Sequence, residues 1–288
     1  MKISEILKNR EITVSYEVFP PKTTANYQSV KSAAFEIASL KPDFMSVTYG
    51  AAGTTKGFTF ELAQQIKEQQ GIDTLAHLTC INSTKPQIEE TLGDLKERGL
   101  DNILALRGDE PSDGTVCVSD YKYASELVTH IKQSSQFCVG GACYPEGHID
   151  CEHKSVDIQN LKKKVDAGAE FLTTQMFFDN NILYNFLYRI REIGITVPVI
   201  AGIMPVTNSA QIKRIMQISG TYLPTRFKAI LDRFDNDPDA MKQAGIAYAT
   251  EQIIDLIANG VNHIHIYSMN KPEVARSIEQ NLSDIIKR

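Results

Sequence analysis

The chain has 288 residues, a net charge of −5 and 42% hydrophobic residues, so it can bury one large core and lacks the excess of lysine and arginine that nucleic-acid binding requires. No apolar run reaches the roughly 18 residues of a membrane-spanning helix, and the polar N-terminal segment lacks the apolar core of a signal peptide. The five cysteines are an odd number that suits no disulfide framework, so we expect a cytoplasmic protein with reduced thiols and with neither nucleic-acid nor membrane partners.

Short runs of β-forming residues recur at intervals of about 30 residues, the length of one strand–helix–strand unit. Helical patterns lie between them, over residues 26–40, over residues 155–167 before Gly168, and after Pro272. Strands that alternate with helices favour parallel pairing through right-handed crossovers. The eight predicted strands begin at Thr13, Phe44, Thr74, Asn102, Phe137, Phe171, Val197 and His263.

Eight units of nearly constant length predict an α/β fold, a (β/α)8 TIM barrel, as a single domain over residues 1–288. The segment between the seventh and eighth strands is about twice as long as the others, and helical patterns near residues 210–219 and 241–258 predict an extra helix there. The alternative is an open, doubly wound sheet. Its Gly-x-Gly-x-x-Gly fingerprint is absent, as is a phosphate-binding loop ending in Gly-Lys-Ser/Thr.

Polar residues gather where the predicted strands end, which is where the active sites of β/α barrels lie. Burying such groups without partners costs about 1–3 kcal/mol each, so one large polar ligand at the barrel mouth would account for them together. The residues at these positions are Glu17, Thr48, Tyr49, His77, Thr79, Arg107, Asp109, Tyr144, Glu146, His148, Thr174, Gln175, Tyr267, Ser268 and Asn270.

Two acidic residues stand out among them. Glu17 lies between Tyr16 and Val18 in an apolar strand, where a desolvated carboxyl group can keep its proton near neutral pH as a general acid does. Pairing with a buried arginine or lysine is the alternative for Glu17. Asp109 follows Arg107 by two residues, so both side chains can face one way, toward a ligand or in a mutual salt bridge.

The sequence also holds a lysine run and two groups of potential metal ligands. The run from Lys162 to Lys164 fits either a solvated helix face or a phosphate site. The cysteines and histidines between Cys138 and His153 lack the spacing of a zinc knuckle. For His263 and His265 no supporting acidic ligands are evident, which favours hydrogen-bonded histidines, and we predict no metal site.

Taken together, the strand ends resemble the methylenetetrahydrofolate reductase family. Eight matching stretches occur in the family's order and cover almost the whole chain. They are SYEVFPPKT from Ser15, MSVTYGA from Met45, AHLTCI from Ala76, ALRGDEP from Ala105, CYPEGH from Cys143, DIQNLKKKVDAGAEFLTTQMFFD from Asp157, GIMPVTN from Gly202 and HIYSMNK from His265.

The resemblance implies a barrel that holds FAD non-covalently and works in two steps in one-carbon metabolism. NADH or NADPH reduces the flavin and leaves, and methylenetetrahydrofolate then accepts the hydride and becomes methyltetrahydrofolate. It also implies a homo-oligomer. Two alternatives stay open at this point, a flavin- or folate-binding subunit of a larger redox complex and another FAD barrel oxidoreductase.

Residue by residue, the resemblance makes Glu17 the general acid that opens the folate ring, and Asp109 the carboxylate between flavin and pterin. Gln175, Gln211 and Lys271 would contact the substrates. Lys271 stands where many relatives have arginine, and Ile215 where relatives have a stacking phenylalanine. The implied flavin-binding residues are Thr48, Tyr49, Ala51, His77, Arg107, Gly108, Asp109, Ala124, Tyr144, His148, Asp157, Asn160, Lys163 and Lys164.

Overall fold

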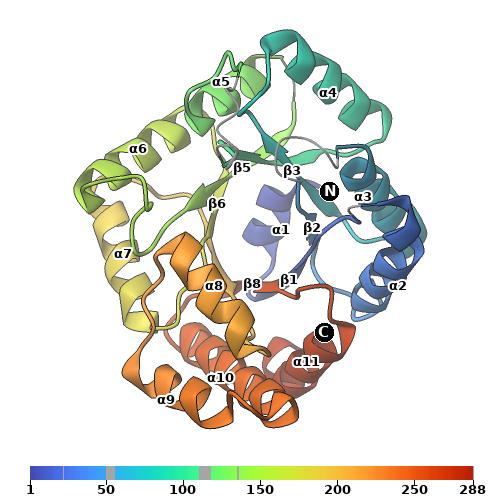
Figure 1. Cartoon of the computed structure of the whole chain (residues 1–288). Coiled ribbons are helices and arrows are strands. Elements are labelled where there is room, and N and C mark those ends of the chain that lie inside the picture. Colours follow the sequence, from blue (N-terminus) through green and yellow to red (C-terminus); the bar gives the residue numbers. More distant parts are fainter. Residues whose placement is uncertain (22, 50–55, 110–117, 135, 288) are drawn as a thin grey trace.

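Eight parallel strands close into a barrel in chain order (Figure 1). The structure is a computed structural model that describes residues 1–21, 23–49, 56–109, 118–134 and 136–287. Each strand pairs with the next, and β8 pairs with β1 to close the ring. The strands are β1 (Thr13–Val18), β2 (Met45–Val47), β3 (Thr74–Thr79), β4 (Asn102–Leu106), β5 (Cys138–Cys143), β6 (Phe171–Thr174), β7 (Val199–Ile203) and β8 (His263–Tyr267).

Helices surround the barrel and cover its outer face, apart from the N-terminal helix, which lies at one end inside the ring of strands. They are α1 (Ile3–Asn9), η1 (Thr24–Asn26), α2 (Tyr27–Ala38), α3 (Lys56–Gln70), α4 (Lys85–Glu97), α5 (Ala124–Ser134), α6 (Lys154–Asp166), α7 (Asn180–Glu192), α8 (Ser209–Ser219), α9 (Thr225–Phe234), α10 (Pro238–Ala258) and α11 (Pro272–Ile286). No helix in the described part of the chain is long and apolar enough to cross a membrane.

The predicted TIM barrel and all eight predicted strands are confirmed, although most strands end sooner than their apolar runs. The run from Phe171 shows why, because β6 stops at Thr174 while apolar residues continue to Phe178. Met176 and Phe178 pack in a separate apolar cluster with residues of α8, α9 and α10 instead of extending the sheet. An apolar run therefore indicates burial, and only part of each run forms the strand.

The predicted extra helix between the seventh and eighth strands is confirmed, and α9 accompanies it. The sequence prediction missed α9, a 10-residue helix whose buried side chains are Phe227 and Leu231. In Figure 1, α8 lies nearer the barrel axis than α9 and α10, which belong to the outer ring. This segment therefore brings one helix close to the barrel mouth.

The N-terminal segment is a helix that closes one end of the barrel. Ile3, Ile6 and Leu7 of α1 are buried against residues at the N-terminal ends of the strands. The backbone N–H of Ile3 donates to Asn102 Oδ1 at 2.9 Å, which fixes the start of α1 against β4. Figure 1 shows α1 inside the ring of strands. With this end filled, ligands have access from the C-terminal ends of the strands.

Candidate active site

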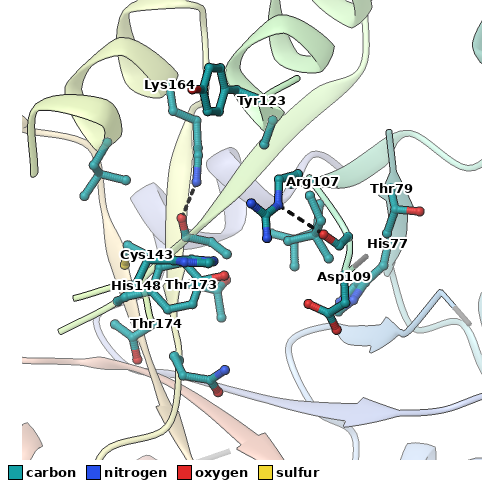
Figure 2. Close-up of a pocket in the computed structure, with 18 of the residues that line it drawn as sticks. His77, Thr79, Arg107, Asp109, Tyr123, Cys143, His148, Lys164, Thr173 and Thr174 are labelled. Carbon is teal, nitrogen blue, oxygen red and sulfur yellow. Dashed lines mark hydrogen bonds between the residues drawn. The ribbon is translucent and has the colours of Figure 1, made fainter. Parts of the chain in front are cut away.

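A cavity of about 650 Å³ opens at the C-terminal ends of the strands, within the size range of small-molecule and cofactor sites. Figure 2 shows His77, Arg107 and Asp109 on one side of it, with Cys143, His148 and Lys164 across from them. The residues singled out from the sequence that line it are Glu17, Thr48, Tyr49, His77, Thr79, Arg107, Gly108, Asp109, Ala124, Tyr144, His148, Asp157, Asn160, Lys163, Lys164, Thr174, Gln175 and Tyr267.

Of the site residues that the family resemblance implies, Gln211 and Lys271 stand apart from this lining. Ala51 lies outside the described residues. Gln211 is in the first turn of α8, where its backbone N–H donates to the capping Asn208 Oδ1 at 2.8 Å. Lys271 follows β8 and donates from Nζ to Thr207 Oγ1 at 2.6 Å. Gln211 and Lys271 are thus attached to the segments that leave β7 and β8, outside the cavity wall.

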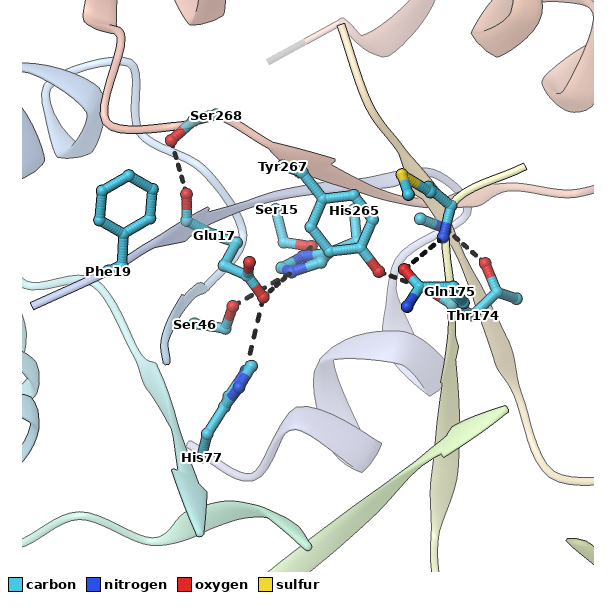
Figure 3. A network of polar contacts seen from close by, with 12 residues as sticks. Ser15, Glu17, Phe19, Ser46, His77, Thr174, Gln175, His265, Tyr267 and Ser268 are labelled. Carbon is cyan, nitrogen blue, oxygen red and sulfur yellow. Dashed lines mark hydrogen bonds and ion pairs between the residues drawn. The ribbon is translucent and has the colours of Figure 1, made fainter. Parts of the chain in front are cut away.

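Glu17 lies in the cavity with two histidines beside its carboxylate (Figure 3). Its Oε2 is 3.8 Å from Nε2 of His77 and 4.0 Å from Nε2 of His265. Its side chain is 19% exposed, so it faces the cavity rather than being sealed among apolar neighbours. The partners that the structure gives Glu17 are therefore histidines, where the sequence had suggested a lysine or arginine as the alternative to a free acid.

His77 is a buried residue with one ring nitrogen that can form a further hydrogen bond. Burial lowers its pKa to about 4, against an opposing effect of the Glu17 charge, so the imidazole is uncharged at neutral pH. Its Nε2 has no hydrogen-bond partner among the described residues. An unpaired buried nitrogen is costly, so a ligand that reaches it gains a hydrogen bond already oriented by the fold.

His265 is held from both sides by hydroxyl groups. Ser15 Oγ donates to Ile264 O at 3.0 Å and lies 2.7 Å from Nδ1 of His265. Since the Ser15 proton is used on the carbonyl, Nδ1 of His265 carries a proton and donates to Ser15. Ser46 Oγ lies 3.1 Å from Nε2 on the other side of the ring. The orientation of the ring is therefore fixed, with its Nε2 at 4.0 Å from Oε2 of Glu17.

The lysine run divides between two environments. Lys162 pairs with Asp166 on the helix surface. Lys163 and Lys164 line the cavity, and Lys164 donates from Nζ to Ala142 O at 2.6 Å. Burial lowers the pKa of Lys164 and raises that of the nearby Asp157. Two of the three lysines thus present cations to the cavity, and the third has the solvated position usual for such runs.

Arg107 has a partner that the sequence did not reveal. Its guanidinium donates from Nη2 to Asp150 at 2.7 Å, and this hydrogen bond holds the pKa of Asp150 below its usual value. Asp150 lies in the loop between β5 and α6, which carries no periodic pattern from which the contact could be inferred. Gly108, next to Arg107, has a φ of +88°, and a Cβ there would lie 2.6 Å from Ile81 Cγ2, so the turn requires glycine.

Tyr267 is another cavity residue with no role assigned from the sequence. Its hydroxyl donates to Thr174 O at 2.5 Å, and burial raises its pKa well above the usual value. The sequence placed it at a strand end without a function. Within the described residues, no group of three or more His, Cys, Asp or Glu side chains is arranged to hold a metal ion. His263 instead bonds to Thr13 Oγ1 at 3.0 Å.

A closed β/α barrel with a large cavity at the carboxyl ends of its strands is the arrangement typical of enzymes that act on small molecules. Residues 2–283 match the family model described as methylenetetrahydrofolate reductase. The chain belongs to this family, and it is an oxidoreductase.

Similar proteins cover most of the chain. It is 36% identical over 267 residues to the 5,10-methylenetetrahydrofolate reductase of Pectobacterium carotovorum, covering 93% of this chain and 89% of the relative. It is 34% identical over 295 residues to methylenetetrahydrofolate reductase (NADH) 1 of Arabidopsis thaliana, covering 98% of this chain and 50% of the plant protein.

Among solved structures, an uncharacterized protein from Clostridium thermocellum, described as binding two copies of 5-methyl-5,6,7,8-tetrahydrofolic acid, matches with a TM-score of 0.64. Its identity is 14%, and the match covers 100% of this chain and 99% of that chain, so the likeness concerns the fold.

Proposed function

We propose that this enzyme reduces methylenetetrahydrofolate to methyltetrahydrofolate, with FAD bound in the cavity and NADH or NADPH as the electron donor in a ping-pong reaction. One observation carries the proposal. The described residues that the family resemblance assigns to FAD all line one cavity, and Glu17 and Asp109 line the same cavity. Bound FAD would supply hydride transfer, which no side chain of the chain can perform.

The residues present fit FAD by their chemistry. Lys163, Lys164 and Arg107 provide cations suited to a pyrophosphate, because charge-assisted hydrogen bonds to phosphate are the strong ones. The unpaired Nε2 of His77 offers a directed contact to a polar ring atom. Gly108, whose backbone lies tight against Ile81 and Thr79, allows the turn that places Arg107 and Asp109 at the cavity.

Glu17 and Asp109 have different roles in the reduction of the folate. Glu17 holds a proton at its carboxyl group and delivers it to the folate, so that the five-membered ring opens to an electrophilic iminium. The negative charge of Asp109 stabilises that cation within the cavity. The buried hydroxyl–histidine contacts below Glu17 keep its surroundings fixed while substrates exchange.

The absorbance spectrum of the purified protein tests the proposal. We expect a flavin band and, with NADH or NADPH, reduction of methylenetetrahydrofolate by the isolated chain. A colourless protein that FAD cannot reconstitute would remove the basis of the proposal. A flavin-containing protein that turns over neither substrate without a further subunit would instead support the binding-subunit alternative.

Replacing Asp109 with asparagine should raise the midpoint potential of the bound flavin, because a negative charge beside it is lost. We expect a rise of roughly 30 mV, which corresponds to about 1.4 kcal/mol for a two-electron couple. Folate reduction should slow by roughly tenfold because the iminium loses its counter-charge. Spectroscopic redox titration measures the potential. The control is Asp101→Asn, which removes a charge immediately before β4 begins, at the end of the strand far from the cavity. An unaltered flavin potential in Asp109→Asn would place the Asp109 carboxylate away from the flavin ring.

A further inference from the structure

One turn at the cavity wall also contacts the connector between α8 and α9. The turn is closed by a hydrogen bond from Gly147 N to Tyr144 O at 3.0 Å. Tyr144 lines the cavity, where its ring packs edge-on against His148 with centroids 4.5 Å apart. Glu146 belongs to the same turn, and its Oε2 accepts a hydrogen bond from the backbone N–H of Tyr222 at 2.7 Å. Tyr222 lies in the connector that follows Gly220.

The carboxylate of Glu146 is buried more deeply than this one contact explains. Its Oε1 is buried and has no hydrogen-bond partner among the described residues. Burial raises the pKa of Glu146, opposed by the Tyr222 bond and the charge of Lys154. Leaving a carboxylate oxygen buried without a partner has a free-energy cost. The contact between Glu146 and Tyr222 is therefore kept in the fold despite this free-energy cost.

The connector ends the helix that lies nearest the barrel axis. α8 stops at Gly220, whose φ of +67° gives the left-handed cap that ends the helix. Ile149, from the same loop as Glu146, lies beside Gly220. At its other end α8 is tied to the end of α9, because Ser209 and Lys213 both contact Asp235. The loop after β5 therefore holds one end of α8, and α9 holds the other.

We infer that Glu146 is a positioning residue that latches the α8–α9 connector to the cavity wall and so fixes α8 for substrate binding. The inference rests on the proposed function, in which residues of α8, Gln211 among them, meet the substrates. The turn holds Tyr144 on the cofactor side and Glu146 on the α8 side in one rigid unit. Small displacements of groups that orient a substrate weaken its binding. The latch is therefore expected to affect KM for the substrates, and not kcat.

Glu146→Ala should release the connector. We expect faster amide hydrogen exchange in the peptide over residues 220–224, because the Tyr222 N–H loses its acceptor. The KM values for NADH and methylenetetrahydrofolate should rise by about tenfold, the scale of one hydrogen bond to a charged group. Both kcat and FAD content should stay within about twofold of the parent. Glu146→Gln should restore both exchange and KM, because the amide oxygen still accepts from Tyr222. Glu152→Ala, an exposed change in the same loop, is the matched control.

Each result decides the matter. Unchanged exchange in Glu146→Ala would mean that the contact does not hold the connector, and faster exchange with unchanged KM would mean that the connector does not position α8. If Glu146→Gln behaves like Glu146→Ala, acceptance from Tyr222 is not the basis of the latch. Loss of FAD or of folding in the alanine variant, with a normal glutamine variant, would make Glu146 a support of the whole site and overturn a role confined to α8. Failure of the proposed function appears separately, as a parent protein without flavin or turnover, and the exchange measurement still applies to it.

Discussion

Replacing Lys163 and Lys164 together with alanine should weaken FAD binding by roughly 10²–10⁴, because each lysine loses a charge-assisted contact worth about 1.5–3 kcal/mol. Both side chains line the cavity from α6. Lys164 is the more constrained of the two, since its Nζ already donates to Ala142 O and burial lowers its pKa. An arriving phosphate would favour the ammonium form and so reverse part of that effect.

The lysine run contains its own control. Lys162→Ala removes the same charge from the same helix, but Lys162 pairs with Asp166 on the outer surface. Titration of the apoprotein with FAD, followed by the fluorescence of free flavin, gives the dissociation constant of each variant. We expect Lys162→Ala to bind FAD as the parent does. Equal binding of FAD by the parent and the double variant would show that Lys163 and Lys164 do not contact the FAD phosphates.

The fold was predictable because periodic patterns and the rules for parallel sheets depend on local sequence. Strands such as Thr13–Val18 are buried along almost their whole length and appear as apolar runs, and the alternation with helices leaves few topologies. The α9 helix was missed although Phe227, Ile230, Leu231 and Phe234 recur at helical spacing. Its stability comes from packing of Phe227 against Phe178 and Tyr248, with ring centroids 5.0 and 4.2 Å apart, and these partners are distant in sequence.

The candidate site was predictable to the extent that its residues follow strands. Glu17, His77 and Asp109 could be placed at the barrel mouth because the closed sheet brings all strand ends together. The contacts among them could not be predicted, since they depend on side chains of neighbouring strands in register. Ser15 meets His265 only because β1 and β8 pair with those two residues side by side.

Contacts made by loops were the least predictable. Asp150 reaches Arg107 and Glu146 reaches Tyr222, across 43 and 76 residues of sequence. Both acidic residues lie in the loop between β5 and α6, which has no period that marks which face a residue takes. A strand fixes the direction of a side chain by alternation, whereas a loop fixes it through the turn it adopts, and that turn is set by the packing around it.

Glu17→Gln should separate the two half-reactions. Flavin reduction by NADH or NADPH needs no proton from the acid that activates folate, so its rate should stay within a few-fold of the parent. Folate reduction needs the proton that opens the ring, and its rate should fall by roughly 10²–10⁴, the usual contribution of a positioned general acid. His77 is a poor replacement for the missing acid near neutral pH, because its pKa of about 4 leaves the imidazole uncharged, and neutral imidazole is a far weaker acid than imidazolium.

The substitution leaves the surroundings of Glu17 in place. Glutamine is nearly isosteric, and its amide keeps a donor and an acceptor beside the two imidazole nitrogens, which lie 3.8 and 4.0 Å from Oε2 of Glu17. Stopped-flow measurement of each half-reaction, with Glu11→Gln as an exposed control before the same strand, separates the steps. Equal slowing of both half-reactions would make Glu17 a binding or structural residue. If neither half-reaction slows, another group supplies the proton, and the acid belongs to the remaining titratable groups of the cavity. Asp109 is the first of these to test, because it lines the same wall of the cavity as His77.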